Sequence, residues 1–435
     1  MWFVFRIVLA VLIIVLTEFY FIKKVTNSIK TIFPSHNEIK RKRWSTFFLV
    51  IINIYPAYLL AAWTYSRISS QGVFIPESLL FDYFIVIPFW IWMLLVIQSI
   101  LILLPVELIK LILFPVYKNF KKRLRQGESK FVLALVIFFI LYIPARVIYD
   151  YYAVSIRITE YKKASLPDAF NNFKLVFISD IQADEFTNDE RLERFIEKVN
   201  STSPDLVLAG GDFITSTPNY IETSAKYAGK IKSKYGVFSC VGDHDNWAHR
   251  NNTSKSLKEV TLALEKQNVK MINNEKRTID INGAEIGLAF ITNTYVEKIN
   301  ETRFNNVIGS GIRGDLKIML AHQPSDFLIE KAGKYDFNLL LAGHTHGGQV
   351  TFLFPFKNLT PTLFETNYLR GDFRFGDLLM VVTRGLGMSL VPLRYNSTPE
   401  VTVIMINPRQ QFLPFPINKR CVIKPISCLL RPSFS

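Results

Sequence analysis

Apolar and polar positions divide the chain into two parts with different periodicities. The first third contains four long apolar stretches, and about 20 such residues suffice for a helix to cross a bilayer. From about residue 161, short β-branched and aromatic runs alternate with polar stretches of helical period, as in an α/β domain. The pattern predicts membrane spans near residues 2–22, 46–66, 80–104 and 131–149, followed by a globular domain.

The same pattern sets the boundaries that we expect along the chain. A transmembrane helical region covers residues 1–150, and a linker of residues 151–173 joins it to an α/β domain of residues 174–407. The tail, residues 408–435, is basic and rich in proline, which favours a poorly ordered segment near lipid. Buried helices of a soluble core are the weaker interpretation, because soluble helices of this length are rarely apolar on every face.

The chain of 435 residues carries a formal net charge of +15, and its basic residues are unevenly placed. They gather in the loops after the first and third apolar stretches, which the positive-inside rule assigns to the cytoplasm. The surplus charge is therefore a topology signal and a contact with anionic lipid, and we expect no nucleic-acid partner. Four spans then place the α/β domain on the extracytoplasmic side of a cell (inner) membrane.

Five apolar runs of the second part end in residues that can bind metal. The chain has only six histidines, and four of them lie where such a run ends. Each end alone is compatible with a polar turn, but side chains that follow the carboxyl ends of strands in an open α/β sheet meet at one edge. The candidate ligands at these ends are Asp180, Gln182, Asp212, Asp243, His322, His344 and His346.

The mixture of ligand types narrows the chemistry. Carboxylates and imidazoles without thiolates suit Mn²⁺, Fe or Zn²⁺, and suit Mg²⁺ less well. The set is too large for one ion, whereas two divalent metal ions about 3.5–4 Å apart that share a carboxylate would use all of it. Such a pair activates water and stabilises a leaving oxygen, so the residues point to hydrolysis of a phosphate ester or anhydride.

The order of these blocks resembles the calcineurin-like metallophosphoesterase family. The family's blocks read D-x-H, G-D-x-x-D, G-N-H-[DE], a lone H and G-H-x-H, and counterparts follow in that order between residues 174 and 406. Stretches 383–387 and 392–396 are similar to its membrane-associated bacterial branch, typified by YkuE and YaeI. The resemblance implies a four-layer α-β-β-α metallophosphoesterase sandwich with a dinuclear site.

The resemblance also assigns a role to each metal ligand. Asp212 would bridge the two ions. The ligands of the first ion would be Asp180 and His346, joined by either the amide oxygen of Gln182 or no further side chain. Those of the second would be Asp243, His322 and His344.

Further residues would act on the substrate. His244 would protonate the leaving group or neutralise the transition state, and Asp245 would orient His244. Arg384 and Arg394 are candidates for bidentate binding of substrate phosphate, although loop arginines are mostly solvated.

Three positions depart from the family pattern. Gln182 replaces an imidazole, Asp243 replaces an amide, and Thr215 replaces the last carboxylate of G-D-x-x-D. Gln182 weakens the first site for a borderline metal, while Asp243 adds negative charge to the second. The changes favour either a shift towards Mn²⁺, our preferred metal, or a weakened first site; we expect retained activity because Asp212, His244 and the G-H-x-H block are intact.

A domain tied to a membrane meets substrates near the bilayer, which favours a lipid-linked phosphoester or pyrophosphate. The resembling branch implies a UDP-2,3-diacylglucosamine-type pyrophosphate as one candidate, but that substrate is cytoplasmic and conflicts with the expected topology. The alternative is a membrane sensor whose degenerate phosphoesterase domain only binds metal or ligand. The aromatic segment 352–373 follows the metal turn and either contacts the bilayer or an acyl chain, or closes the core.

Overall fold

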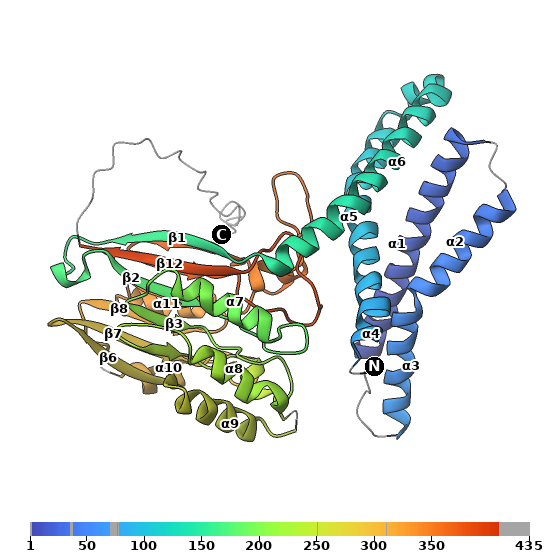
Figure 1. Cartoon of the computed structure of the whole chain (residues 1–435). Coiled ribbons are helices and arrows are strands. Elements are labelled where there is room, and N and C mark those ends of the chain that lie inside the picture. The colour runs from blue at the N-terminus through green and yellow to red at the C-terminus, as the bar shows by residue number, and fades with distance from the viewer. Residues whose placement is uncertain are drawn as a thin grey trace, which may run out of the picture.

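The computed structural model describes residues 2–34, 38–69, 76, 78–249, 251–309 and 311–408. The predicted tail lies outside the described residues from residue 409 onward. A group of long N-terminal helices stands beside an α/β domain, and α6 runs directly into the first strand of that domain (Figure 1).

The N-terminal helices occupy the four stretches predicted as spans. Among the described residues, two helices are long and apolar enough to cross a membrane, at Asp82–Ile112 and Arg123–Tyr152. A third span is counted only if α2 and α3 act as one bent helix, so the predicted four spans are not confirmed. The helices are α1 (Trp2–Ile32), α2 (Glu38–Ile52), α3 (Ile54–Ser69), α4 (Leu79–Phe81), α5 (Ile87–Ile112) and α6 (Phe114–Tyr152), with a π-helical turn (Asp82–Val86) before α5.

The second predicted span is interrupted by a bend of 42° between α2 and α3. Pro56 explains the bend, because proline has no backbone N–H and its ring crowds the carbonyl of the residue four positions earlier, here Ile52. At the break, the Leu49 carbonyl oxygen accepts from both the backbone N–H and the side-chain amide of Asn53, at 3.2 and 3.0 Å. A hydrophobic run alone does not reveal such a break.

Within the described residues, the domain contains two six-stranded sheets. The first sheet has the order β1-β12-β2-β3-β4-β5, and the second has the order β10-β11-β9-β8-β7-β6. The strands of the first sheet are β1 (Ser155–Lys162), β2 (Phe173–Ile178), β3 (Leu206–Ala209), β4 (Val237–Ser239), β5 (Val269–Met271) and β12 (Glu400–Asn407). Those of the second are β6 (Glu275–Ile281), β7 (Ala284–Ile291), β8 (Leu316–Ala321), β9 (Leu339–Ala342), β10 (Gly371–Phe375) and β11 (Leu378–Val382).

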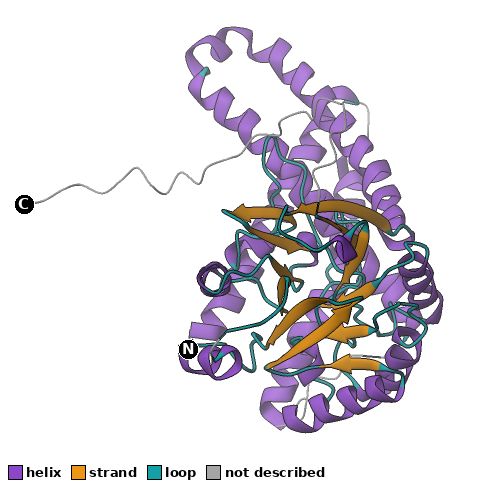
Figure 2. Ribbon diagram, turned by 90° about the vertical axis from the view of Figure 1, so that its left-hand side faces the viewer, coloured by secondary structure: helices purple, strands orange, loops and turns teal. Residues whose placement is uncertain are grey.

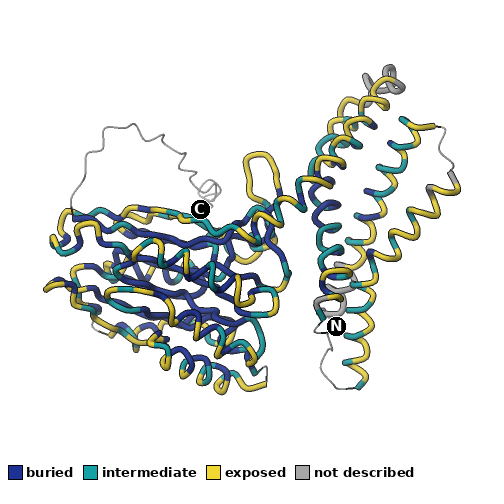
Figure 3. The backbone as a smooth tube through the Cα atoms, viewed as in Figure 1, coloured by how far each residue is buried: buried dark blue, intermediate teal, exposed yellow. Residues whose placement is uncertain are grey.

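Three apolar clusters arrange the sheets and helices in layers. One cluster lies between the sheets and joins residues such as Phe177 and Leu208 to Leu288 and Leu341. The outer face of the first sheet packs against α7 (Asp189–Asn200), α8 (Ile221–Ala228) and α9 (Thr253–Lys266). The outer face of the second packs against α10 (Glu301–Ile308) and α11 (Asp326–Lys334). Helices thus flank the strands on both sides, and the buried residues concentrate in the sheets (Figures 2 and 3).

The expected linker is wrong in part, because residues 155–162 form the edge strand β1. This strand pairs in parallel with β12 over its whole length. Its alternating sequence places Arg157 beside Glu400, with a distance of 2.9 Å between Nε and Oε1. Because five of its eight residues are polar, the strand lacks the continuous apolar run by which the central strands were predicted.

The domain contacts the helices through the loops that follow β9 and β11. Phe352, Leu393 and Tyr395 join an apolar cluster with residues of α5 and α6, including Leu94 and Phe139. The Tyr142 hydroxyl donates to the Asn396 side chain at 2.8 Å, which adds a polar link at the same junction. The loops that carry the end of the metal turn are therefore packed against the candidate spans.

Candidate metal centre

The predicted ligands follow the carboxyl ends of β2, β3, β4, β8 and β9 and meet between the two sheets. Several of these residues have left-handed backbone conformations, with φ values of 56° at Asp180, 61° at Asp212 and 69° at His344. Such conformations cost roughly 1–3 kcal/mol for a residue other than glycine and persist where the surroundings impose them. Several ligand residues share this unfavourable backbone conformation, so the surrounding structure fixes the positions of their side chains against the local preference of the backbone.

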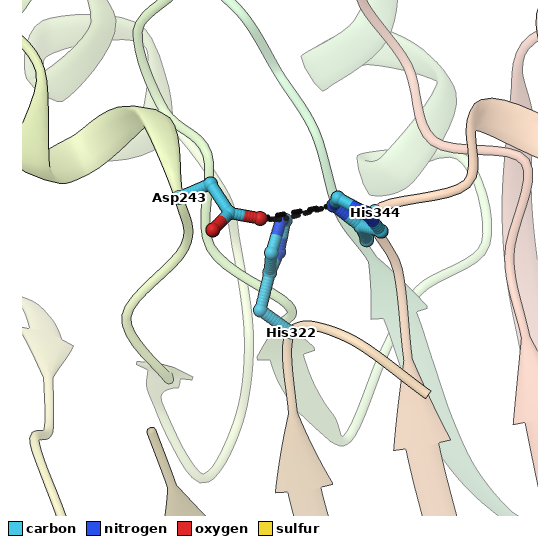
Figure 4. Close-up of side chains that lie close together, drawn as sticks. All are labelled: Asp243, His322 and His344. Atoms are coloured by element: carbon cyan, nitrogen blue, oxygen red, sulfur yellow. Dashed lines mark hydrogen bonds and ion pairs between the residues drawn. The ribbon is translucent and has the colours of Figure 1, made fainter. Parts of the chain in front are cut away.

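Asp243, His322 and His344 form one of two clusters (Figure 4). Asp243 Oδ2 lies 3.2 Å from His322 Nε2 and 3.0 Å from His344 Nδ1. All three ligand atoms lie within 4.8 Å of one another. This trio is the one that the resemblance assigned to the second ion.

Asp180, Asp212 and His322 form the other cluster, with ligand atoms also within 4.8 Å of one another. Asp212 Oδ2 lies 3.2 Å from His322 Nε2, so His322 is common to both clusters. His346 lies beside this cluster, with Nε2 at 3.6 Å from Asp180 Oδ1. The Gln182 amide donates to Asp212 Oδ2 at 2.8 Å.

Hydrogen bonds on the far side of two rings select the nitrogen that faces the site. His322 Nδ1 lies 2.7 Å from the Gly210 carbonyl oxygen, which can only accept, so Nδ1 carries the proton and Nε2 is the ligand atom. His344 Nε2 lies 2.9 Å from the Glu365 carboxylate, which leaves Nδ1 for the site. Carboxylate and carbonyl partners of this kind orient histidine ligands and raise their basicity.

The close contacts between carboxylates and imidazoles shift the pKa values of the clustered residues. Burial alone would raise the pKa of Asp243, but hydrogen bonds with His322 and His344 outweigh burial and hold this pKa well below its usual range. Burial would lower the pKa of His322, yet the neighbouring Asp212 and Asp243 carboxylates raise it well above its usual value. The buried carboxylates therefore attract positive charge, and a divalent cation meets the same demand.

The pKa of His346 is shifted in the opposite direction to that of His322. Burial and the adjacent Arg394 guanidinium lower the pKa of His346 well below its usual value, so the ring is neutral. A neutral imidazole is the form that binds a metal.

The donor set fits a metal. Within the described part of the chain, Gln182 Oε1 is a buried oxygen without a hydrogen-bond partner, and it sits on a side chain that contacts Asp212. The backbone at Gly343 lies so close to Ser179 and Asp180 that only glycine fits there. A Cβ added to Gly343 would lie 1.9 Å from Ser179 Oγ and 2.8 Å from Asp180 Oδ2. Carboxylate, imidazole and amide donors gathered this closely form a site for divalent cations.

His244 lies at the edge of the clusters, with its backbone N–H donating to Asp212 Oδ1 at 2.8 Å. Its Nδ1 contacts the Thr215 carbonyl oxygen, so this nitrogen carries a proton. Its Nε2 lies 3.1 Å from Ser389 Oγ. Nε2 is therefore the atom that can gain or release a proton.

Asp245 bonds to backbone groups and not to the His244 ring, which it was predicted to orient. Its carboxylate accepts backbone N–H bonds from Asp212, Phe213 and Gly242 at 2.8–2.9 Å, rather than a bond from the His244 ring. Burial and the Asp212 charge raise the pKa of Asp245 to about 6. The residue fixes the loops that carry two ligands, and Thr215 and Ser389 position His244 instead.

Arg394 also differs from its predicted role as a phosphate ligand. The side chain is fully buried, and its guanidinium donates to the carbonyl oxygens of Gly387, His346 and Ser397 at 2.8–3.2 Å. Through these contacts, Arg394 stabilises the turn that carries His346. Arg384 remains partly exposed beside Glu400, with 3.4 Å between Nε and Oε2, and contacts none of the metal ligands directly in the described structure.

Four residues at the site were not predicted from the sequence. Gln323 donates to Asp243 Oδ2 at 2.7 Å, and the Tyr295 backbone N–H donates to Asp243 Oδ1 at 2.5 Å. Glu365 and Ser389 contact His344 and His244 as described. Gln323 directly follows a predicted ligand and was within reach of sequence reasoning, whereas the others come from loops without periodicity.

Two cavities open on either side of the ligands. A cavity of about 800 Å³ reaches His244 and has an apolar part formed by Phe186, Trp247, Met388 and Leu390. A cavity of about 400 Å³ reaches His344 and has a more polar lining, including Asn293, Lys298, Gln323 and Glu365. Pro76, which precedes α4, also lines the larger cavity, so this opening faces the N-terminal helices.

With the fold and the site described, the chain can be compared with known families. Residues 173–348 match the family described as calcineurin-like phosphoesterase, so this part of the chain is similar to that family. The match supports a metal-dependent phosphoesterase hydrolase, in agreement with the clustered His and Asp residues. The predicted family and mixed α/β fold are confirmed.

The relatives with curated names include membrane proteins. The Bacillus subtilis protein named uncharacterized metallophosphoesterase YkuE is 28% identical over 248 residues, which cover 56% of this chain and 82% of that protein. A Danio rerio protein named transmembrane protein with metallophosphoesterase domain is 30% identical over 249 residues, which cover 55% of this chain. The match spans 54% of the fish protein, about half its length. Such relatives and the two candidate spans together suggest membrane association.

Solved structures also align with part of the chain. The structure of a protein described as a novel archaeal phosphodiesterase aligns with 49% of this chain and 84% of its own chain, at 12% identity and a TM-score of 0.27.

Proposed function

We propose that this protein is a membrane-anchored, dinuclear-metal phosphoesterase that hydrolyses a phosphoester or pyrophosphate bond of a lipid-linked substrate. The observation that supports it best is the convergence of ligands from five strand ends beside the cavity that His244 lines. Asp180, Gln182, Asp212 and His346 would hold one ion, and Asp243, His322 and His344 would hold the other. Mn²⁺ is the preferred metal, with Fe or Zn²⁺ as alternatives.

The protein's own residues supply orientation and proton transfer. Bound divalent ions would lower the pKa of water and neutralise phosphate charge. His244 is positioned through Nδ1 by the Thr215 carbonyl, so Nε2 faces the cavity with Ser389 and can deliver a proton to a departing oxygen. Glu365 and Gly210 hold the rings of His344 and His322 in the orientations required of ligands.

The lining of the larger cavity favours a substrate with an apolar portion. Phe186, Trp247, Met388 and Leu390 lie on the His244 side, whereas the opening near His344 is polar. A lipid-linked phosphate can place its acyl part against the first lining and its polar part towards the second. The nearby helix α4 and Pro76 connect this cavity with the membrane-facing part of the chain.

The first test measures turnover by the full chain reconstituted in nanodiscs with Mn²⁺ and a chromogenic phosphodiester. We expect His244→Asn to lower turnover by about 10²–10⁴-fold while metal content stays constant, because only the proton-transferring ring is lost. His249→Asn is the matched control, since His249 is bonded to Glu259 and lies outside the site. Equal turnover by the wild type and His244→Asn would contradict the proposed role.

The second test concerns the substrate class. Leu390 is 93% exposed and lines the larger cavity, so Leu390→Asp removes apolar surface without disturbing the core. We expect it to slow hydrolysis of a UDP-2,3-diacylglucosamine-type lipid by roughly tenfold, about the effect of one lost apolar contact of 1–2 kcal/mol, and to spare the chromogenic diester. Leu262→Asp on α9 is the matched control. Equal effects on both substrates would reject an acyl-binding role.

The competing proposal is a membrane sensor with a degenerate site. It is favoured by Gln182, whose amide uses an Asp212 oxygen that would otherwise be available to metal. The sensor predicts bound metal, measured by elemental analysis, without turnover of any phosphoester tested with Mn²⁺, Fe²⁺ or Zn²⁺. Turnover that depends on His244 rejects the sensor.

The extracytoplasmic placement of the domain is proposed from the distribution of basic loops. Leu262 on α9 is 47% exposed, so Leu262→Cys, in a chain with Cys421 and Cys428 replaced by serine, reports on the side of the membrane in intact cells. Labelling by a membrane-impermeant maleimide supports the extracytoplasmic side. Labelling only after lysis places the domain in the cytoplasm, where UDP-2,3-diacylglucosamine is found.

A further inference from the structure

The loop between β9 and β10 begins at the metal turn and projects along the N-terminal helices (Figure 1). Phe352 and Leu359 form an antiparallel bridge, with a backbone bond of 2.8 Å from Phe352 N to the Leu359 oxygen. The residues between them form a hairpin tip. All six are exposed, namely Leu353, Phe354, Pro355, Phe356, Lys357 and Asn358.

The base of this hairpin is fixed to α5 by a buried amide. Gln98 Oε1 accepts from the Leu353 N–H at 2.7 Å, and Gln98 Nε2 donates to the Leu353 carbonyl oxygen at 2.8 Å. Gln98 is fully buried, and its Oε1 also lies 3.2 Å from the Tyr395 hydroxyl. A glutamine within an apolar span requires such partners, and here the hairpin backbone provides them.

The depth of Gln98 decides where the hairpin lies. The candidate span Asp82–Ile112 has 31 residues and is about 46 Å long, which exceeds a hydrocarbon core of about 30 Å by about 16 Å. Gln98 is about 24 Å from Asp82 along the helix axis. Even if the whole excess lies on the domain side, Gln98 is about 8 Å inside the core boundary. Tilting the helix places a longer stretch in the core and moves Gln98 deeper.

We propose that the hairpin tip, residues 353–358, is inserted in the lipid bilayer beside α5 and α6. The tip carries Leu353, Phe354 and Phe356, and Phe356 is completely exposed, so the domain itself provides no apolar cover for it. The acyl region of the bilayer is the occupant that fits, because the hairpin continues the apolar contact of Phe352 with α5 and α6. The metal turn, which begins the same segment, is thereby held at the membrane surface.

Site-directed spin labelling of the full chain in liposomes of phosphatidylcholine and phosphatidylglycerol tests this proposal. The background replaces Cys421 and Cys428 with serine and retains Cys240, which is buried. A nitroxide is placed at Phe356→Cys, at Ile137→Cys on the exposed face of α6, and at Leu262→Cys on α9. Power saturation then compares collisions with oxygen and with a water-soluble nickel chelate.

We expect the ratio of oxygen to nickel collisions at Phe356→Cys to be several-fold higher than at Leu262→Cys and to approach the ratio at Ile137→Cys. Because Phe356 packs against nothing, the label does not disturb the fold. A ratio at Phe356→Cys equal to that at Leu262→Cys, with Ile137→Cys remaining lipid-exposed, would overturn the proposal. The readout is independent of turnover, so its failure is distinguishable from failure of the proposed function.

Discussion

The two ligand clusters differ in how completely they are assembled. In one, Asp243 faces His322 and His344 at 3.0–3.2 Å, and Gln323, Tyr295 and Glu365 support the carboxylate and one ring. In the other, His346 is 3.6 Å from Asp180, and a Gln182 amide hydrogen occupies an Asp212 oxygen. The first of these two arrangements is ready to hold a cation, whereas the second is looser.

This difference coincides with the departures from the family pattern. Asp243 adds a carboxylate to the compact cluster, and Gln182 removes an imidazole from the loose one. Supporting hydrogen bonds commonly change metal affinity by 10- to 100-fold, so the two clusters should bind cations with clearly different affinities. Three substitutions can separate the affinities of the two clusters for cations. One acts on both clusters, one on the compact cluster alone and one on the loose cluster alone.

Asp212→Asn should have the largest effect on metal binding and turnover. Asp212 is bonded to Gln182 and faces His322, which is common to both clusters. We expect loss of metal from both clusters and turnover reduced to background, since an amide is a weaker ligand and carries no charge. Elemental analysis after removal of free Mn²⁺ measures the first effect. Retention of the full metal content would show that Asp212 is not shared. Asp189→Asn, at the start of α7, is the matched control.

Gln323→Leu should weaken the compact cluster alone. The substitution removes the 2.7 Å bond to Asp243 Oδ2 and leaves the contacts of Asp180 and Asp212 in place. We expect the affinity of the tighter Mn²⁺ site to fall by about 10- to 100-fold in calorimetric titrations. Gln267→Leu at the end of α9 should change neither site. Weakening of the looser site only would mean that the assignment of affinities is reversed.

The central strands and their ligands were predictable because two signals coincided. The buried runs Leu206–Ala209 and Leu339–Ala342 are continuous and apolar, as expected for strands covered on both faces, and each ends in a ligand block. The edge strand β1 was missed because its apolar residues alternate with polar ones. The break at Asn53, before Pro56, was missed because it lies within an apolar run.

Roles of side chains were less predictable than their positions. Asp245 and Arg394 lie beside the site as predicted, but both bond mainly to backbone groups, including the Asp212 N–H and the His346 carbonyl oxygen, which are distant in sequence. Glu365 reaches His344 from an irregular loop 21 residues away, where no periodicity gives a signal. Partners of this kind depend on the tertiary path of loops, which local sequence patterns do not determine.

Of the three substitutions, Gln182→His should change the affinity for Mn²⁺ least, and it should act on the loose cluster alone. The imidazole would replace an amide whose hydrogen occupies Asp212 Oδ2, and it would supply a stronger ligand beside Asp180. We expect the weaker Mn²⁺ site to tighten by up to about tenfold, with the tighter site unchanged, in the same calorimetric titration. Gln267→His is the matched control for added imidazole. If the weaker site were unaffected while the variant stayed folded, Gln182 would not be the cause of the difference between the clusters, and the 3.6 Å separation of His346 from Asp180 would have to account for it.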